Sequence, residues 1–206
     1  LFLRKLSVTI ILAAIFSCIA TIFWFQEGKY LLPTPIPKNY VPIIPAQLVR
    51  LDSTMLPNSI SKPTLFHFFN PDCPCSRFNL KHFLSLNKKY KSHVDFYAVV
   101  TDEEKVVAAK EMLDDGIIIL VDSNEKLAKA CGVYSTPQAA ILQTDQTLFF
   151  RGNYNRARYC TDKNSNFVQM ALDSLMASQA PPHFNELATH SYGCELSDNQ
   201  SSSLVP

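Results

Sequence analysis

The feature that most constrains this chain is a short junction where an apolar run meets two cysteines and then a helical pattern. The run Thr64–Phe69 is mostly apolar and aromatic, as expected for a buried strand. Cys73-Pro74-Cys75 follows it, and apolar residues at helical spacing come next over Ser76–Tyr90. A cysteine at such a junction lies at the helix N-terminus, where backbone N–H groups and the helix dipole stabilise a thiolate. The junction therefore predicts thiol chemistry or binding of a soft metal.

A second constraint is the uncharged, mostly apolar run Leu6–Phe25. As a helix, this run covers about 30 Å, which is the thickness of a bilayer core. Arg4 and Lys5 precede it, so the positive-inside rule places this end in the cytoplasm. We expect a single-pass anchor in the inner (cytoplasmic) membrane, with the following domain facing the periplasm or the exterior. A cleaved signal peptide is the alternative, although no small-x-small cleavage site follows Phe25.

The chain divides further by composition. Residues 1–27 form the predicted anchor, and residues 28–45 form a proline-rich linker. The prolines favour extended polyproline geometry, which is typical of a stiff spacer. We expect a compact domain over 46–180 and an irregular tail over 181–206. The last residues of this tail, Ser197–Pro206, are polar and are expected to be disordered.

Strand-like and helix-like segments alternate within the domain. Strands are expected over Thr64–Phe69, Val94–Val100, Ile117–Val121, Gln138–Gln143 and Leu148–Gly152. Helices are expected over Ser76–Tyr90, Asp102–Leu113, Asn124–Ala130 and Phe167–Met176. The first three strands should be parallel because helices connect them, whereas the last two form a hairpin. The fold class is therefore α/β, with helices on both faces of the sheet.

Three features along the domain together resemble the thioredoxin fold. They are Cys73-Pro74 before the first helix, the stretch Val133-Tyr134-Ser135-Thr136-Pro137-Gln138 that leads into a strand, and the final hairpin and helix. The resemblance implies a thioredoxin-like three-layer α/β/α sandwich. It also implies that a cis peptide bond precedes Pro137 and that its loop faces the reactive cysteine. Thr136 and Pro137 are then expected to bind the extended backbone of a substrate.

The resemblance is closest to the redoxin branch, which contains peroxiredoxin-like and thiol:disulfide interchange-like proteins. The stretch Phe149-Phe150-Arg151-Gly152-Asn153-Tyr154 resembles a run found in redoxins. The stretch Ser191-Tyr192-Gly193-Cys194 resembles a Gly-Cys pair near the C-terminus of some of them. The resemblance covers the domain and extends to the tail.

The motif itself departs from the Cys-x-x-Cys of thioredoxins, because one residue separates Cys73 from Cys75. If Cys73 takes the family's first position, Ser76 takes the second; if Cys75 takes the second, Asp72 takes the first. We favour the first alignment, because Cys73 then lies at the helix start. Peroxiredoxins carry Thr or Ser three residues before the reactive cysteine, where this chain has Asn70, and this difference argues against a peroxidase.

The other cysteines allow several interpretations. Of the six cysteines, Cys18 lies in the apolar run and is interpreted as a small apolar residue. Cys131 ends a predicted helix, and we interpret it as a buried small hydrophobe. The simplest interpretation of Cys160 and Cys194 is a structural disulfide that holds the tail against the domain. A resolving role for Cys194 stays open if the tail folds back over Cys73.

Two polar residues near the motif are further candidates. Arg77, in the first turn of the helix, could lower a thiol pKa or orient a substrate, or be a solvated helix residue. His67 lies in an apolar strand and is interpreted as a core histidine. It is also a candidate ligand for Cu(I), because Cys-x-Cys with a histidine suits a soft ion.

The sequence therefore predicts a membrane-anchored, exported thiol:disulfide oxidoreductase that acts on protein thiols and disulfides. Cys73 is the expected attacking thiolate, and Cys75 is expected to resolve the mixed disulfide. No cofactor and no bound metal are expected, and the net charge of +1 gives no electrostatic case for nucleic acid. The alternatives are a Cu(I)-binding metal-delivery protein, a redoxin-type peroxidase and a non-catalytic scaffold with structural cysteines.

Overall fold

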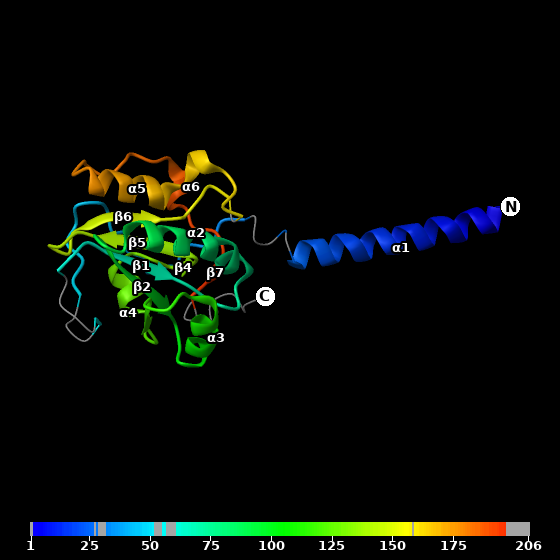
Figure 1. Cartoon of the computed structure of the whole chain (residues 1–206). Helices are drawn as coiled ribbons and strands as arrows, with labels where there is room; N and C mark the ends of the chain where they lie inside the picture. Colours follow the sequence, from blue (N-terminus) through cyan, green and yellow to red (C-terminus); the bar gives the residue numbers. More distant parts are fainter. Residues whose placement is uncertain are drawn as a thin grey trace. The chain divides into compact units, whose positions relative to one another are not determined.

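The computed structural model describes residues 2–26, 28, 32–51, 55–56, 61–157 and 159–196. The chain forms two compact units that divide between Leu32 and Pro33. The first unit contains helix α1 (Phe2–Gln26), and the second contains the sheet and the other described helices (Figure 1).

Helix α1 exposes apolar side chains along its length. The stretch Arg4–Gln26 is long and apolar enough to cross a membrane, and none of the side chains in its most apolar part is buried. Ile11, Phe16 and Phe23 are each more than half exposed. Such a surface suits a bilayer core, because a helix pairs its backbone groups within itself along the membrane-spanning part. The predicted span lies within one helix, and an N-terminal signal sequence would share these properties.

The second unit is built on a five-stranded sheet in the order β3-β2-β1-β5-β6. Its strands are β1 (Thr64–Phe68), β2 (Asp95–Val100), β3 (Ile118–Val121), β5 (Gln138–Leu142) and β6 (Leu148–Gly152). Strands β1, β2 and β3 are parallel, whereas β5 runs antiparallel to both β1 and β6. The helices α2 (Pro74–Tyr90) and α3 (Glu104–Met112) connect the parallel strands, and a tight turn joins the last two, as predicted.

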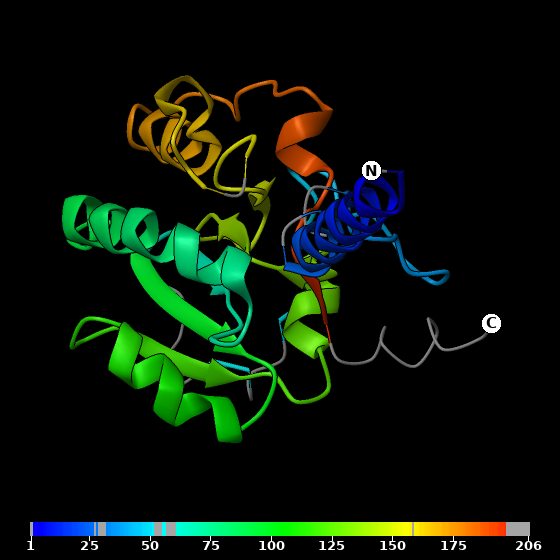
Figure 2. The same cartoon turned by 90° about the vertical axis from the view of Figure 1, so that its right-hand side faces the viewer.

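The helices cover both faces of the sheet. Helices α2, α3 and α5 (Phe167–Met176) lie on one face, and α4 (Lys126–Ala130) lies on the other (Figure 2). Helices α2 and α3 share a face because they belong to successive right-handed crossovers in the same direction. Strands β1 and β5 are buried at every position because both of their faces are covered. The α/β/α sandwich implied by the thioredoxin resemblance is confirmed.

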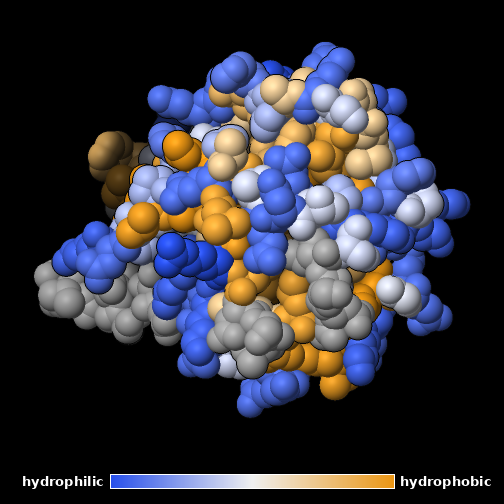
Figure 3. Space-filling model, turned by 90° about the vertical axis from the view of Figure 1, so that its left-hand side faces the viewer, coloured by the Kyte–Doolittle hydropathy of each residue, from blue (hydrophilic) through white to orange (hydrophobic). Residues whose placement is uncertain are grey.

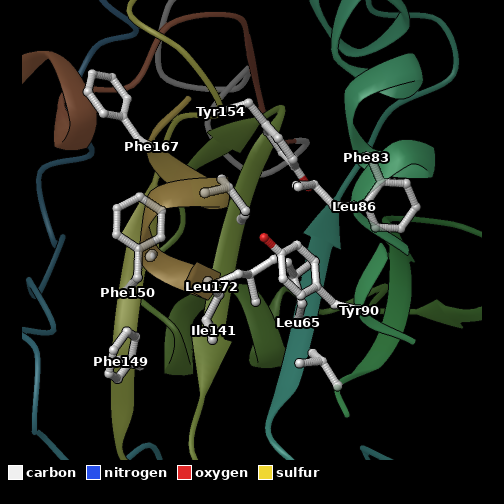
Figure 4. Close-up of a cluster of buried hydrophobic side chains, with 14 of the residues drawn as sticks. Leu65, Phe83, Leu86, Tyr90, Ile141, Phe149, Phe150, Tyr154, Phe167 and Leu172 are labelled. Atoms are coloured by element: carbon white, nitrogen blue, oxygen red, sulfur yellow. The ribbon is translucent and has the colours of Figure 1, made fainter. Parts of the chain in front are cut away.

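The larger part of the core lies between the sheet and helices α2 and α5 (Figure 4). Leu65 and Ile141 from the strands pack there with Phe83 and Leu86 from α2 and Leu172 from α5. Each of these side chains is at most 1% exposed. Burial of a side chain of this size contributes about 2 kcal/mol, so the cluster holds α2 firmly against the sheet.

The opposite face of the sheet is covered partly by segments that precede β1 and follow α6 (Glu186–Thr189) in the chain. Phe66 and Phe68 point to this side, since successive residues of a strand alternate between faces. Val49 and Leu196 pack with them and are 1% and 4% exposed. Elsewhere on the surface, hydrophobic side chains are interspersed with polar ones, as Figure 3 shows for one face.

The proline-rich segment, expected to be a stiff spacer, packs on the domain from Pro33 onwards. The Thr34 N–H donates to the Ser191 carbonyl at 2.8 Å. The Tyr40 hydroxyl donates to the Gly132 carbonyl at 2.9 Å. An extended, proline-rich chain makes few internal hydrogen bonds, here including one from the Tyr40 N–H to the Pro37 carbonyl at 3.0 Å, so other backbone groups can pair with distant segments. The second compact unit therefore includes this segment.

The segment expected to be an irregular tail contains two short elements. They are α6 (Glu186–Thr189) and β7 (Cys194–Glu195). Strand β7 pairs with β4 (Ser135–Thr136) in a separate two-stranded sheet. Pairing with another segment orders these residues, and the sequence pattern alone does not reveal such a partner. The stretch Ser197–Pro206, expected to be disordered, lies outside the described residues.

His67 lies within β1 and is fully buried. Its Nδ1 atom is 2.8 Å from the Tyr154 hydroxyl oxygen. Its ring stacks on that of Phe83, with 4.2 Å between centroids. Burial lowers the pKa of His67 from 6.5 to about 3. It is a neutral core histidine, as the sequence interpretation held.

We expect His67 to make the domain less stable as the pH falls from about 7 to about 4. Unfolded His67 binds a proton near its ordinary pKa of 6.5, whereas folded His67 stays neutral down to about 3. Falling pH therefore favours the unfolded state, by up to about 1.4 kcal/mol per pH unit between these values. Urea unfolding of the full chain in detergent, followed by near-UV circular dichroism, measures this slope. The slope should be shallower in His67→Phe, and an unchanged slope would contradict the assignment.

Candidate active site

Cys73 occupies the N-cap position of α2, at the end of the loop that follows β1. Pro74 begins the helix, where the absence of a proline N–H removes no helical hydrogen bond. The Asp72 N–H donates to the Asn70 side-chain oxygen at 3.0 Å. The Cys73 N–H donates to the Asn70 carbonyl, also at 3.0 Å. These local bonds hold Cys73 at the helix N-terminus, as the sequence predicts.

Cys73 is joined to Cys194 by a disulfide, with Cα atoms 6.1 Å apart. Cys194 reaches this position because β7 pairs antiparallel with β4, which places Cys194 opposite Thr136. The Cys73 sulfur lies 3.7 Å from the Thr136 carbonyl oxygen. The peptide bond between Thr136 and Pro137 is cis, as the resemblance implied. The structure thus brings Cys73, Thr136 and Pro137 together and adds Cys194 to them.

This pairing differs from the simplest prediction, a disulfide between Cys160 and Cys194. Cys160 is a free thiol, and its sulfur lies 2.7 Å from Asn79 Oδ1 on α2. Burial raises the pKa of Cys160 to about 12. The tail folds back over Cys73 instead, which is the arrangement that the sequence left open. Strand pairing at the loop before Pro137 decides the partner of Cys194. The spacing of the cysteines along the chain does not predict this pairing.

Cys75, predicted to be the resolving cysteine, is a free thiol that is 0% exposed. Burial raises its pKa to about 11, so at this position the loss of hydration outweighs the helix dipole. Its carbonyl accepts a hydrogen bond from Asn79 Nδ2 at 2.8 Å. Cys75 therefore lies in the first turn of α2 without forming a disulfide.

Arg77 and Cys131 take supporting places. Arg77 Nε donates to the Pro71 carbonyl at 2.9 Å, so this side chain braces the loop that carries Cys73. Cys131 ends α4 and is fully buried among apolar side chains, as the sequence interpretation held. Burial raises the pKa of Cys131 well above its ordinary value. Its thiol is a packing group.

Several residues that hold the tail in place were missed by sequence reasoning. The Ser191 and Ser135 hydroxyls are hydrogen-bonded to each other. The Ser191 N–H donates to the Tyr134 hydroxyl oxygen at 3.2 Å. The Tyr192 hydroxyl donates to the Asn155 carbonyl at 2.9 Å. The Gly-Cys pair beside these residues was the one sequence signal that drew attention to the tail. A strand of two residues has too short a pattern to be predicted.

A groove of about 710 Å³ opens beside β7. Residues 35–41 of the proline-rich segment form one wall, and Tyr134 and Glu195 contribute to its lining. Glu125 and Lys129 also line it, and they form an ion pair at 3.4 Å. The groove is mainly apolar, and its lining includes Glu195 and Leu196, the two residues that follow Cys194.

The structure also bears on the predicted alternative of copper binding. Within the part of the chain that the structure describes, no group of three or more His, Cys, Asp or Glu is placed to hold a metal ion. His67, the candidate histidine, is enclosed in the core and bonded to Tyr154.

We predict that Cys75 and Cys160 resist alkylation in the folded protein. With pKa values of about 11 and about 12, few of these thiols are ionised at neutral pH. At pH 8 the thiolate fraction of Cys75 is about one in a thousand, and burial slows access further. Iodoacetamide labelling with and without urea, mapped by mass spectrometry, measures this. Modification of native Cys75 at the rate seen in urea would contradict its placement.

The chain is similar in structure to several solved proteins. An uncharacterized conserved protein from Geobacillus kaustophilus matches with a TM-score of 0.58 and 21% identity, covering 80% of this chain and 96% of that one. A hypothetical protein from Sinorhizobium meliloti 1021 matches with a TM-score of 0.57 and 19% identity, covering 66% and 80%. The thioredoxin domain of a thiol-disulfide oxidoreductase from Bacteroides vulgatus matches with a TM-score of 0.46 and 16% identity, covering 58% and 96%. At 21% and 19% identity, the first two likenesses show the fold alone.

Comparison with curated proteins finds no match to this chain. One protein family, described as "Domain of unknown function (DUF6436)", matches residues 45–195, which is more than half of the chain. The matched region contains both partners of the disulfide, Cys73 and Cys194, and the loop before Pro137. The chain therefore belongs to the DUF6436 family.

Proposed function

We propose that this protein is a membrane-anchored thiol-disulfide oxidoreductase whose redox couple is Cys73 and Cys194. The observation that carries the proposal is the disulfide between the N-cap of α2 and the strand paired with the loop before Pro137. A thioredoxin-like fold supports it, because the reactive cysteine of that fold stands where Cys73 stands.

One feature of Cys73 favours its thiolate once the disulfide is reduced: it stands at the N-terminus of α2, although its side chain is only 1% exposed while the disulfide is intact. Helix α2 is 17 residues long and has no acidic residue in its first turn. The positive end of its dipole therefore meets the sulfur at the N-cap, and this lowers the free energy of the thiolate relative to the thiol. A stable thiolate makes Cys73 both a good nucleophile and a good leaving group.

The exchange reaction follows from this couple. A substrate thiolate attacks the Cys73 sulfur, which forms a substrate–Cys73 disulfide and releases Cys194 as a thiolate. A second substrate thiolate attacks the substrate sulfur of that mixed disulfide and releases the Cys73 thiolate. Two electrons thereby pass from the substrate dithiol to the Cys73–Cys194 disulfide. The reverse sequence oxidises the couple, and its reduction potential relative to its partners sets the direction.

Cys194 takes the resolving role that the sequence assigned to Cys75. Cys75 is fully buried, and its pKa of about 11 keeps its thiol protonated near neutral pH. A protonated, enclosed thiol attacks a mixed disulfide slowly. Cys194 is bonded to Cys73 and lies in β7, which pairs with β4 over only two residues.

Helix α1 provides the membrane anchor in this proposal. Arg4 and Lys5 flank its apolar part at the N-terminal end, which favours that end on the cytoplasmic side. The thioredoxin-like domain then faces the periplasm or the exterior, where disulfides persist. Substrates are protein thiols and disulfides, bound in extended form along the loop at Thr136 and Pro137.

The test measures turnover with insulin or glutathione disulfide, using the full chain in detergent. We expect Cys73→Ser to lower turnover by at least about 100-fold, because the attacking thiolate is lost. Cys194→Ser should also stop turnover, yet it should accumulate the mixed disulfide of Cys73 with the substrate. Cys75→Ala should keep turnover within about threefold of the wild type.

The three variants separate the possible redox couples. Lost turnover in Cys75→Ala with retained turnover in Cys194→Ser would assign the couple to Cys73 and Cys75 instead. Full activity in Cys73→Ser would remove the proposed function altogether. Circular dichroism of each variant checks that the fold is retained.

A further inference from the structure

Strand β7 presents Cys194 to the active site as a bound peptide would. It is only two residues long, and it pairs antiparallel with the edge strand β4. In this register Cys194 lies opposite Thr136, whose carbonyl oxygen is 3.7 Å from the Cys73 sulfur. Main-chain pairing of this kind aligns an extended segment through its backbone, and the groups beside the strand then decide which side chains fit.

At Gly193, the residue before Cys194, there is no space for a side chain. Gly193 has a φ of +126°, a conformation that L side chains rarely adopt. A Cβ atom at this position would overlap with the Thr136 carbonyl oxygen and come within 3.2 Å of Pro137 Cδ. Both neighbours belong to the loop that faces Cys73, so neither can move without displacing the site. Only glycine fits directly before the cysteine.

The residue two places after the cysteine is also selected. Leu196 is 4% exposed and packs in the core cluster that contains Phe66 and Phe68. It lines the groove of about 710 Å³ together with Glu195 and the proline-rich segment. An apolar side chain here is buried, whereas Glu195 between it and the cysteine is partly exposed. A segment that pairs with the edge of β4 should therefore contain Gly-Cys, then any residue, and then an apolar residue.

We propose that the edge of β4 is the binding site for substrate segments of the form Gly-Cys-x-apolar, and that the chain's own tail at 193–196 occupies this site as an internal copy of the substrate. The inference rests on the proposed thiol-disulfide exchange at Cys73 and adds the class of substrate to it. When a substrate thiolate attacks Cys73, Cys194 leaves as a thiolate, and the tail gives up the edge to the substrate strand.

The experiment uses the full-length Cys194→Ser chain in detergent, which has an unpaired Cys73. The probe is the peptide Ser-Tyr-Gly-Cys-Glu-Leu with its cysteine bonded to a thionitrobenzoate group. The Cys73 thiolate attacks the peptide sulfur, the Cys73–peptide disulfide forms, and the coloured thionitrobenzoate thiolate leaves. Two control peptides carry Ala in place of the Gly or Ser in place of the Leu.

We expect the Gly peptide to react at least about tenfold faster than the Ala peptide, because the added Cβ overlaps the backbone of the loop. The Ser control should react more slowly as well, because it leaves the apolar site unfilled. Adding Gly193→Ala to the Cys194→Ser chain should accelerate the Gly peptide further, since it loosens the chain's own tail. Equal rates for the Gly and Ala peptides would overturn the inference.

Two further measurements keep the result decisive. Wild-type protein is treated with the same peptides as free thiols, and release of the Cys194 thiol should show the same preference for Gly over Ala even if the variant is poorly folded. Dithiobis-nitrobenzoate, which has no peptide backbone, reports whether Cys73 reacts at all. An inert Cys73 with every reagent would overturn the proposed function, whereas a reactive Cys73 without peptide preference would overturn only the substrate assignment.

Discussion

The pairing of β7 with β4 is the contact on which the rest of the site depends. Two residues on each strand are too few to pair stably by themselves. The pairing persists because the disulfide ties Cys73 to Cys194 across 121 positions of sequence, and because the Thr34 N–H bonds to the carbonyl of Ser191. A cross-link over a loop of this size contributes about 5 kcal/mol in the chain-entropy description. The same bond therefore stabilises the tail and forms the reactive centre.

Two cysteines one residue apart have different roles, although both side chains are buried, at 1% exposure for Cys73 and 0% for Cys75. Cys73 stands at the N-cap of α2, where the helix dipole favours a thiolate once the disulfide is reduced. Cys75 lies in the first turn, fully enclosed, and burial raises its pKa to about 11. The helix dipole contributes at most about 2 kcal/mol, whereas removal from water can shift a pKa by several units. What distinguishes the two cysteines is that Cys73, at the N-cap, is bonded to Cys194, whereas Cys75 keeps a free thiol.

Much of the fold could be predicted because it is written in local patterns. The strands and helices lie close to their expected ranges, the first three strands are parallel, and His67 and Cys131 lie in the core. The packing of the proline-rich segment was harder to predict. Its composition indicates the geometry of an isolated chain, whereas the contact of Tyr40 with Gly132 depends on the folded domain. The tail was harder still, because its strand is only two residues long and exists only with its partner.

The resemblance to the thioredoxin fold implied the cis-proline loop. The sequence by itself determined that a cysteine would stand at a helix N-terminus after a buried strand, and that an apolar helix would precede the domain. These features depend on residues that are neighbours along the chain. Only the tertiary structure decided which cysteine bonds to Cys73. Cys75 was the expected partner and Cys194 was left open, and the choice depends on strand pairing between distant segments. Such pairing is a property of the folded surface, which no local pattern contains.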